Sequence, residues 1–226
     1  MKNGFIIITL MLLLCQSCGK QEVDAQLFIY GNDFETGDYT GLTGVFISRF
    51  DNSLMMGPFN NSGFRLTLND LPAHDFIRVT FDLYIHDSWE GNSNDSGTGE
   101  LDHDAWFIEF EPDENIDPAD KIIFETTFAN TLCIPAWCFN QSYPNPFPSN
   151  NDARTGARQK VLNGRCLWQD TPNGTSVYKI NKVFPHTRTS TVISIYDELK
   201  QDAPFSPLCE ESWSLDNLAV SVFTTE

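Results

Sequence analysis

The sequence predicts an all-β protein, a jelly-roll β-sandwich of two antiparallel sheets. Apolar and polar residues alternate in many short segments, and turns rich in Gly, Pro, Asn and Asp separate these segments. No stretch shows a convincing helical period over ten residues. Long loops between the segments favour a jelly roll over a closed barrel, and the length of 226 residues fits one domain.

The clearest strand lies at residues 77–86, where five aliphatic or aromatic residues alternate with polar ones. The best short helical candidate is SIYDELKQD, residues 194–202. Further strands are predicted at Leu27–Tyr30, Gly44–Arg49, Phe64–Leu68, Trp106–Glu111, Ile122–Phe128, Val177–Phe184, Thr191–Asp197 and Leu215–Phe223.

The N-terminus carries a leader-like segment. Its apolar run, Phe5–Leu14, is too short to span a bilayer, which takes ~20 residues, but suits a signal peptide. With Ser17 before Cys18, the segment resembles a bacterial lipoprotein signal; an ordinary secretory signal is the alternative. The resemblance implies a signal peptide at residues 1–17, a lipidated Cys18 with a tether at 18–25, and the sandwich at 26–226. Gly19 leaves outer-membrane delivery open, at the cell surface or facing the periplasm.

The charge of the chain limits its partners. The 31 Asp and Glu residues exceed the 14 Lys and Arg, which gives a net charge of −17. Nucleic acid binds through Lys and Arg that neutralise phosphates, so the composition argues against nucleic acid and against polyanionic sugars. It is compatible with divalent cations and with neutral partners.

Four cysteines follow Cys18, namely Cys133, Cys138, Cys166 and Cys209. An even number in an exported domain suggests two disulfides, for which three connectivities exist. The spacing in CIPAWC allows a local Cys133–Cys138 loop, which would leave Cys166–Cys209 as the long-range bridge.

The last predicted strand contains a carboxylate in an unusual position. By the two-residue period of a strand, Asp216 shares a face with the apolar residues Leu218, Val220 and Val222. Burying a carboxylate without a partner costs several kcal/mol. Asp216 therefore requires an arginine, backbone donors or a metal ion.

Two short motifs mark the ends of the domain, NDFE at residues 32–35 and LDNLAV at 215–220. Together they resemble the jelly-roll carbohydrate-binding modules and the related MAM-type domains. The resemblance implies that the first and last strands are close in space and that their acids bind a structural calcium ion. The implied ligands are Asp33, Glu35 and Asp216, with Asn217 less certain. In the alternative, Asp216 lies at the sheet rim and accepts backbone N–H bonds.

Five further segments, FDLYIHDSWEG, DAWFIEF, ETTFAN, QSYP and ESWSLDN, resemble in this order a widespread bacterial exported domain with no known reaction. Within them, four acids flank one connection between consecutive strands. They predict a second, weaker calcium site, with a solvated acidic loop as the alternative. These acids are Asp87, Glu90, Asp102 and Asp104.

Binding is easier to support than catalysis. The sequence contains no GxSxG or HExxH motif and no phosphate-binding glycine loop. Aromatic side chains in loops and polar side chains on one strand face predict a sugar-binding surface. The candidates are Trp89, Tyr143, Trp168, Tyr84 and Asp82.

The first hypothesis is a lipid-anchored module that binds a glycan, or another extracellular partner such as a surface protein. One alternative is a polysaccharide lyase or glycosidase with an atypical site. A lyase would use Arg78, Tyr84 and His86, which share one face of the 77–86 strand. The other alternative is a structural subunit of an outer-membrane assembly.

Overall fold

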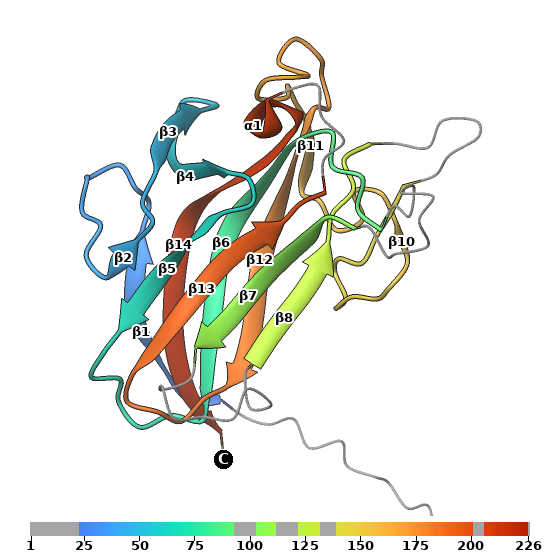
Figure 1. The fold of residues 1–226 in the computed structure, drawn as a ribbon. Coiled ribbons are helices and arrows are strands. Elements are labelled where there is room, and N and C mark those ends of the chain that lie inside the picture. Colours follow the sequence, from blue (N-terminus) through green and yellow to red (C-terminus); the bar gives the residue numbers. More distant parts are fainter. Residues whose placement is uncertain (1–22, 93–102, 112–121, 132–138, 201–205, 226) are drawn as a thin grey trace, which may run out of the picture.

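The computed structural model describes residues 23–92, 103–111, 122–131, 139–200 and 206–225, and these residues form a sandwich of two antiparallel sheets (Figure 1). Sheet A has the order β11-β12-β6-β14-β4-β3, with β1 also paired to β14, and sheet B has the order β2-β5-β13-β7-β8. The predicted fold class is confirmed.

The strands have the following bounds. Sheet A consists of β1 (Val23–Asn32), β3 (Ile47–Phe50), β4 (Ser53–Phe59), β6 (Phe76–Asp87), β11 (Gln159–Leu162), β12 (Thr175–Pro185) and β14 (Glu211–Thr225). Sheet B consists of β2 (Leu42–Thr43), β5 (Gly63–Leu68), β7 (Ala105–Glu111), β8 (Ile122–Thr127) and β13 (Thr191–Glu198). A small pair, β9 (Asn140–Gln141) with β10 (Asn151–Asp152), and one helical turn, α1 (Pro207–Glu210), complete the described elements.

The core lies between the two sheets and follows the alternation in the sequence. In β6, the odd-numbered residues from Ile77 to Ile85 are fully buried, whereas Asp82 and Tyr84 lie on the outer face. Sheet B contributes residues such as Ile193 and Ile195 from the opposite side. Burial of such side chains is the main stabilising contribution in a sandwich of this kind.

Strand β14 is the centre of sheet A. It pairs with β6 along one edge, and with β4 and then β1 along the other edge. Asn32 near the end of β1 is opposite Leu218, so the first and last strands are neighbours, as the resemblance implies. The two sequence motifs NDFE and LDNLAV therefore lie side by side.

The prediction that Asp216 points into the core is wrong, because β14 contains a bulge. The register with β6 shifts between Asp216 and Ala219, and Asn217 has a left-handed φ of 55°. Leu215 and Leu218, three positions apart, are both buried in the core, whereas Asp216 is opposite the outward-facing Asp82. The extra residue breaks the two-residue period, so Asp216 reaches the outer face of the sheet.

Two local predictions also differ from the structure. The helical candidate SIYDELKQD falls in β13 over its first five residues, because Ile193 and Ile195 pack into the core and the strand is hydrogen-bonded on both sides. Strand β4 is missing from the prediction because Gly57 and Pro58 interrupt its pattern, yet Met55 and Met56 are buried there.

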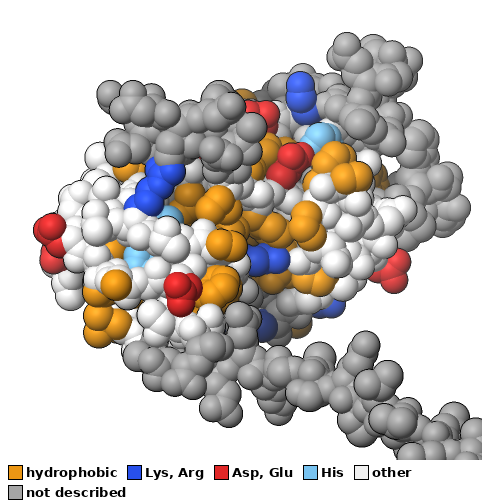
Figure 2. Space-filling view, turned by 90° about the horizontal axis from the view of Figure 1, so that it is seen from below, with side chains coloured by type: hydrophobic (Ala, Val, Ile, Leu, Met, Phe, Trp, Pro, Cys, Tyr) orange, Lys and Arg blue, Asp and Glu red, His pale blue; other side chains and the backbone are white. Residues whose placement is uncertain are grey.

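Both described ends of the chain lie at one end of the sandwich, where Val23 is paired with Thr225. Seen from below, this end shows hydrophobic side chains gathered in the middle, and Asp and Glu side chains that are few and separate (Figure 2). No helix in the described ranges is long and apolar enough to cross a membrane.

Candidate functional site

The outer face of sheet A brings together most of the residues that the two end motifs predict. Asp82 of β6 is opposite Asp216 of β14, and Lys179 of β12 is opposite Asp82 on its other side. The turn after β1, which carries Asp33 and Glu35, approaches the same face, because Glu35 contacts the start of β4.

Glu35 and Asp216 meet through one hydroxyl group. The Oγ of Ser53 lies 3.1 Å from Oε1 of Glu35 and 2.9 Å from Oδ2 of Asp216. The backbone N–H of Leu54 also donates to Oε1 of Glu35, at 2.7 Å. Two carboxylates from distant parts of the chain are thus held next to each other.

Burial raises the pKa of Asp216, and the negative charges of Asp82 and Glu35 raise it further. Hydrogen bonds from the Ser53 hydroxyl and from the backbone N–H of Asn217 act in the opposite direction, because they stabilise the carboxylate. Asp216 is only 6% exposed, so it is a carboxylate in a crowded, acidic environment.

The other two predicted calcium ligands have different contacts. Oδ1 of Asp33 accepts the backbone N–H of Glu35 at 3.2 Å, which shapes the turn. The Asn217 side chain donates to Oδ2 of Asp82 at 3.0 Å. Within the described ranges, no group of three or more His, Cys, Asp or Glu residues is arranged to hold a metal ion. Calcium therefore stays a prediction.

A groove opens beside this cluster, between β1, the following turn and β14. Its volume is about 460 Å³. The ring of Phe28, which is 65% exposed, forms part of its wall. Tyr30, Leu218 and Ala219 also line the groove, and its polar lining residues are Asn32, Asp33, Thr36, Asp38, Thr40 and Asn217.

Tyr84 lies further along the same face and is half-buried. Its ring contacts Phe50 edge-on, with centroids 6.2 Å apart. Burial raises the pKa of Tyr84 to about 12, and the charges of Asp216 and Asp82 add to this effect. A phenol with such a pKa stays protonated at neutral pH, so Tyr84 can donate a hydrogen bond but is a poor base.

The arrangement does not favour the lyase alternative. His86 is 0% exposed, and its ring nitrogens contact the hydroxyls of Thr175 and Ser214. Burial and the charge of Arg165 lower the pKa of His86 well below its usual value. A histidine enclosed in this way cannot reach a polymer, so the trio of Arg78, Tyr84 and His86 does not form an open site.

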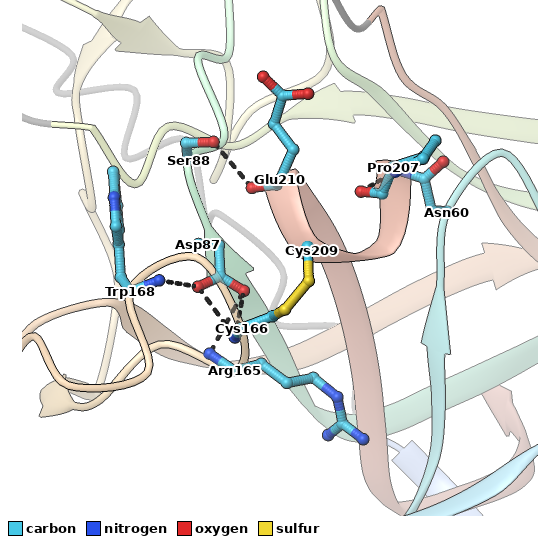
Figure 3. Close-up of a disulfide and its surroundings, with 9 residues drawn as sticks. All are labelled: Asn60, Asp87, Ser88, Arg165, Cys166, Trp168, Pro207, Cys209 and Glu210. Carbon is cyan, nitrogen blue, oxygen red and sulfur yellow. Dashed lines mark hydrogen bonds between the residues drawn. A yellow bond between two sulfur atoms is a disulfide. The ribbon is translucent and has the colours of Figure 1, made fainter. Parts of the chain in front are cut away.

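The second acidic group is divided between two structural roles. The carboxylate of Asp87 accepts the backbone N–H groups of Arg165, Cys166 and Trp168 (Figure 3). Burial raises its pKa to about 6. The carboxylate thereby fixes the loop before β12 against the end of β6.

Asp104 has a different set of partners, since its Oδ2 accepts the backbone N–H groups of Glu90 and Gly91. Burial raises the pKa of Asp104 to about 7. Glu90 is exposed, and Asp102 lies outside the described residues. Asp87 and Asp104 therefore bind separate backbone segments.

The disulfide Cys166–Cys209 lies beside Asp87 and joins its loop to α1, directly before β14 (Figure 3). This pairing is the long-range bridge that the cysteine count allows. Cys133 and Cys138 lie outside the described residues, so their pairing stays a prediction. Trp168 follows Cys166 in the loop and is partly exposed.

The predictions for Trp89 and Tyr143 need correction, because both side chains belong to the core. Trp89 is 0% exposed, and its indole N–H donates to the carbonyl of Ser212 at 2.9 Å. Tyr143 is 7% exposed and packs against Phe128 and Tyr178. Both residues lie outside the strands, yet the segments that carry them are packed inward.

These aromatic residues surround a buried polar network. The Asn130 side chain donates to the carbonyls of Asp87 and Gly174, at 2.9 and 2.8 Å. The Gln141 side chain accepts the hydroxyl of Tyr178 at 3.2 Å. Four of the segments that resemble the bacterial exported domain, namely FDLYIHDSWEG, ETTFAN, QSYP and ESWSLDN, meet around this network. The residues of these motifs that lie around the network therefore have a structural role.

A second groove, of about 780 Å³, lies on the outer face of sheet B. Arg65, Glu109, Ser194 and Tyr196 are among its lining residues. The sequence does not predict this groove, because these residues come from three strands and form no motif. The only signal was the alternation that places each of them on the solvent side of its strand.

Comparison with solved structures gives distant likenesses, among them a carbohydrate-binding module. No protein family and no curated protein matches the chain. Among solved structures, a carbohydrate-binding module described as specific for non-crystalline cellulose, CBM28, aligns with 85% of this chain and 90% of its own length. The sequence identity is 16% and the TM-score is 0.35, so the likeness carries no argument about ligand or site.

Proposed function

We propose that the chain is a non-catalytic module that binds a neutral glycan on the outer face of sheet A. The observation that carries the proposal is the exposed Phe28 ring beside a groove lined by amide, hydroxyl and carboxylate groups. A pyranose ring presents an apolar face of C–H groups and a rim of hydroxyls. It therefore binds to an aromatic ring next to planar polar side chains.

The geometry of the groove fits this chemistry. The Phe28 ring lies over Gly31, where a Cβ would come within 2.5 Å of the ring. Asn32 is fixed by a hydrogen bond to the carbonyl of Asp38 at 2.6 Å. Asp82, with Lys179 at 3.4 Å, extends the polar surface from the groove toward Tyr84. Polar groups held in place lose little conformational freedom when a ligand binds.

The binding test uses insoluble cellulose, mannan, xylan and β-1,3-glucan, with Phe28→Ala as the site variant. Loss of one stacked ring should weaken binding up to about tenfold. Leu27→Ala is the matched control, because Leu27 is 53% exposed next to Phe28 but does not line the groove. Equal binding by wild type and Phe28→Ala, or binding to none of the four polymers, would contradict the proposal.

The same experiment separates the alternatives. Release of soluble sugars from a bound polymer would identify an enzyme. Co-purification with a stoichiometric membrane protein, without glycan binding, would favour a structural subunit. The buried His86 and the high pKa of Tyr84 lead us to expect binding without products.

We also propose a structural calcium ion between Glu35 and Asp216. A cation would relieve the repulsion that contributes to the raised pKa of Asp216, and carboxylates are preferred calcium ligands. Calcium at 100–1,000 times its Kd should add ~3–4 kcal/mol to the free energy of unfolding. Thermal melting with calcium or with EDTA tests this. Glu35→Gln should remove the difference, and an unchanged wild-type melt would count against calcium.

Finally, we propose a lipid anchor at Cys18 that holds the protein on the outer membrane. Only the short segment 19–22 separates Cys18 from β1, so the end of the sandwich with few acids would face the membrane (Figure 2). Metabolic labelling with palmitate should mark the wild type but not Cys18→Ser. A soluble, unlabelled wild type would disprove the anchor.

A further inference from the structure

The groove on sheet B is built by three neighbouring strands in register. Ser194 of β13 lies between Arg65 of β5 and Glu109 of β7. Because serine is short and its flanking neighbours are long, the middle of this row is lower than its sides. The row therefore forms the floor and the walls of a trough that follows β13 between its two neighbouring strands.

An aromatic residue forms the next row of the trough. Tyr196 is opposite Gly63 on one side and Phe107 on the other. Its ring stacks on Phe107, with centroids 4.7 Å apart and an interplanar angle of 14°. The position on its other side, residue 63, has no side chain that would cover the second face of the ring. Tyr196 is half-buried, and its hydroxyl donates to Oε2 of Glu109 at 2.9 Å.

One rim of the trough is held rigidly by buried contacts. The backbone N–H of Asn61 donates to Asp197 at 2.7 Å, and the Asn61 side chain donates to the carbonyl of Leu199 at 3.1 Å. Asp197 is 3% exposed and also accepts the indole N–H of Trp213 at 2.7 Å. The rim is thus connected to the core, as a preformed ligand site requires.

From this arrangement we propose that the groove on sheet B is a second site for a neutral glycan, and that the protein bridges two polysaccharide chains. The volume of about 780 Å³ lies within the usual range for ligand clefts, ~300–1,000 Å³. The exposed guanidinium of Arg65 and the phenol of Tyr196, which Glu109 holds in place, match the hydroxyl rim of a sugar. Glu109 and Glu198 in the lining disfavour a polyanion.

The two grooves lie on opposite faces of the sandwich, and this position is the reason that the protein would bridge two polysaccharide chains. They lie on the outer faces of two sheets packed ~10 Å apart, with the core between them. One straight stretch of polymer cannot occupy both. A chain bound to sheet A and another bound to sheet B would be held together, and a dense matrix would retain the protein by avidity. The ligand class rests on the function proposed above, whereas the second site is independent of Phe28.

The test measures binding and bridging separately. Insoluble cellulose, mannan and β-1,3-glucan are each loaded with protein and then offered fluorescent, soluble hydroxyethyl cellulose, galactomannan or laminarin. Thr43→Trp fills the sheet B groove from its exposed rim, and Tyr196→Ala removes its ring. Thr67→Ala is the control, since Thr67 is exposed on β5 but does not line the groove.

The wild type and Thr67→Ala should bind the solid polymer and capture the soluble one. Thr43→Trp and Tyr196→Ala should still bind the solid polymer but capture about tenfold less of the soluble one. Thr43→Trp combined with Phe28→Ala should bind the solid polymer up to about tenfold more weakly than Thr43→Trp alone. A melting curve for each variant confirms that it is folded.

Three results would overturn the proposal of a second site, and they differ in whether glycan binding on sheet A is also contradicted. Undiminished capture by both Thr43→Trp and Tyr196→Ala would remove the second site and leave glycan binding intact. Complete loss of solid-polymer binding in Phe28→Ala alone would show that sheet A is the one site. Absence of binding by the wild type to all three solid polymers would defeat both proposals.

Discussion

Removal of the Cys166–Cys209 disulfide should cost the protein about 4 kcal/mol of stability. The change is the double substitution Cys166→Ser with Cys209→Ser. The two cysteines are 43 positions apart. For a loop of this length, the chain-entropy relation gives ~13 cal/mol/K, or ~4 kcal/mol at 25 °C. The value reflects the freedom that the bridge removes from the unfolded chain.

The assay is equilibrium unfolding in urea, followed by tryptophan fluorescence. At ~2–3 kcal/mol per M of urea, the midpoint of unfolding should fall by about 1.3–2 M. Substitution is preferable to a reducing agent, which would also act on Cys133 and Cys138. Asp87→Asn is a useful companion, because Asp87 holds the same loop by three backbone N–H groups. A loss below about 1 kcal/mol would refute the entropic reasoning.

Three further predictions concern buried polar groups. Asp197→Ala should lower the free energy of unfolding in urea by ~3 kcal/mol or more, because the indole N–H of Trp213 loses its acceptor. An unchanged free energy of unfolding would show that water replaces the carboxylate. Burial, with the charges of His74 and Arg188, lowers the pKa of His186 to about 4, whereas the unfolded value is 6.5. As the pH falls, the unfolded chain therefore takes up this proton before the folded chain does, which favours unfolding. Between pH 6.5 and pH 4, the Tm of the wild type should fall more steeply than the Tm of His186→Gln. Equal slopes for the two proteins would contradict this prediction. Trp89→Phe should lower the free energy of unfolding by ~1–3 kcal/mol and leave glycan binding unchanged, because Trp89 is buried. A loss of glycan binding without a loss of stability would show that Trp89 contacts the ligand.

The sequence was informative where one rule governs a whole element. The alternation in β6 predicts its core residues because a strand between two partners repeats every two residues. The same rule fails at Asp216, since a single extra residue at Asn217 inverts the faces. A bulge depends on the pairing of two strands, which one strand's pattern does not contain.

The candidate site was predicted in part for a similar reason. The end motifs identified Glu35 and Asp216, which the pairing of β1 with β14 brings together. The position of Trp89 after a predicted strand suggests a surface loop, but its segment packs into the core. The groove around Tyr196 depends on the register of β5, β13 and β7, and that register is a property of the folded sheet.

The central position of β14 has a consequence for how the chain matures. Sheet A stays in separate parts until its last strand arrives, and some of its contacts join residues 195 positions apart. Among the described strands, β14 is the last to leave the ribosome. Sheet A therefore cannot form completely before β14 has been synthesised. Contacts this remote form slowly. Such a polypeptide would stay unfolded for longer during synthesis, as the export implied by the proposed lipid anchor would require.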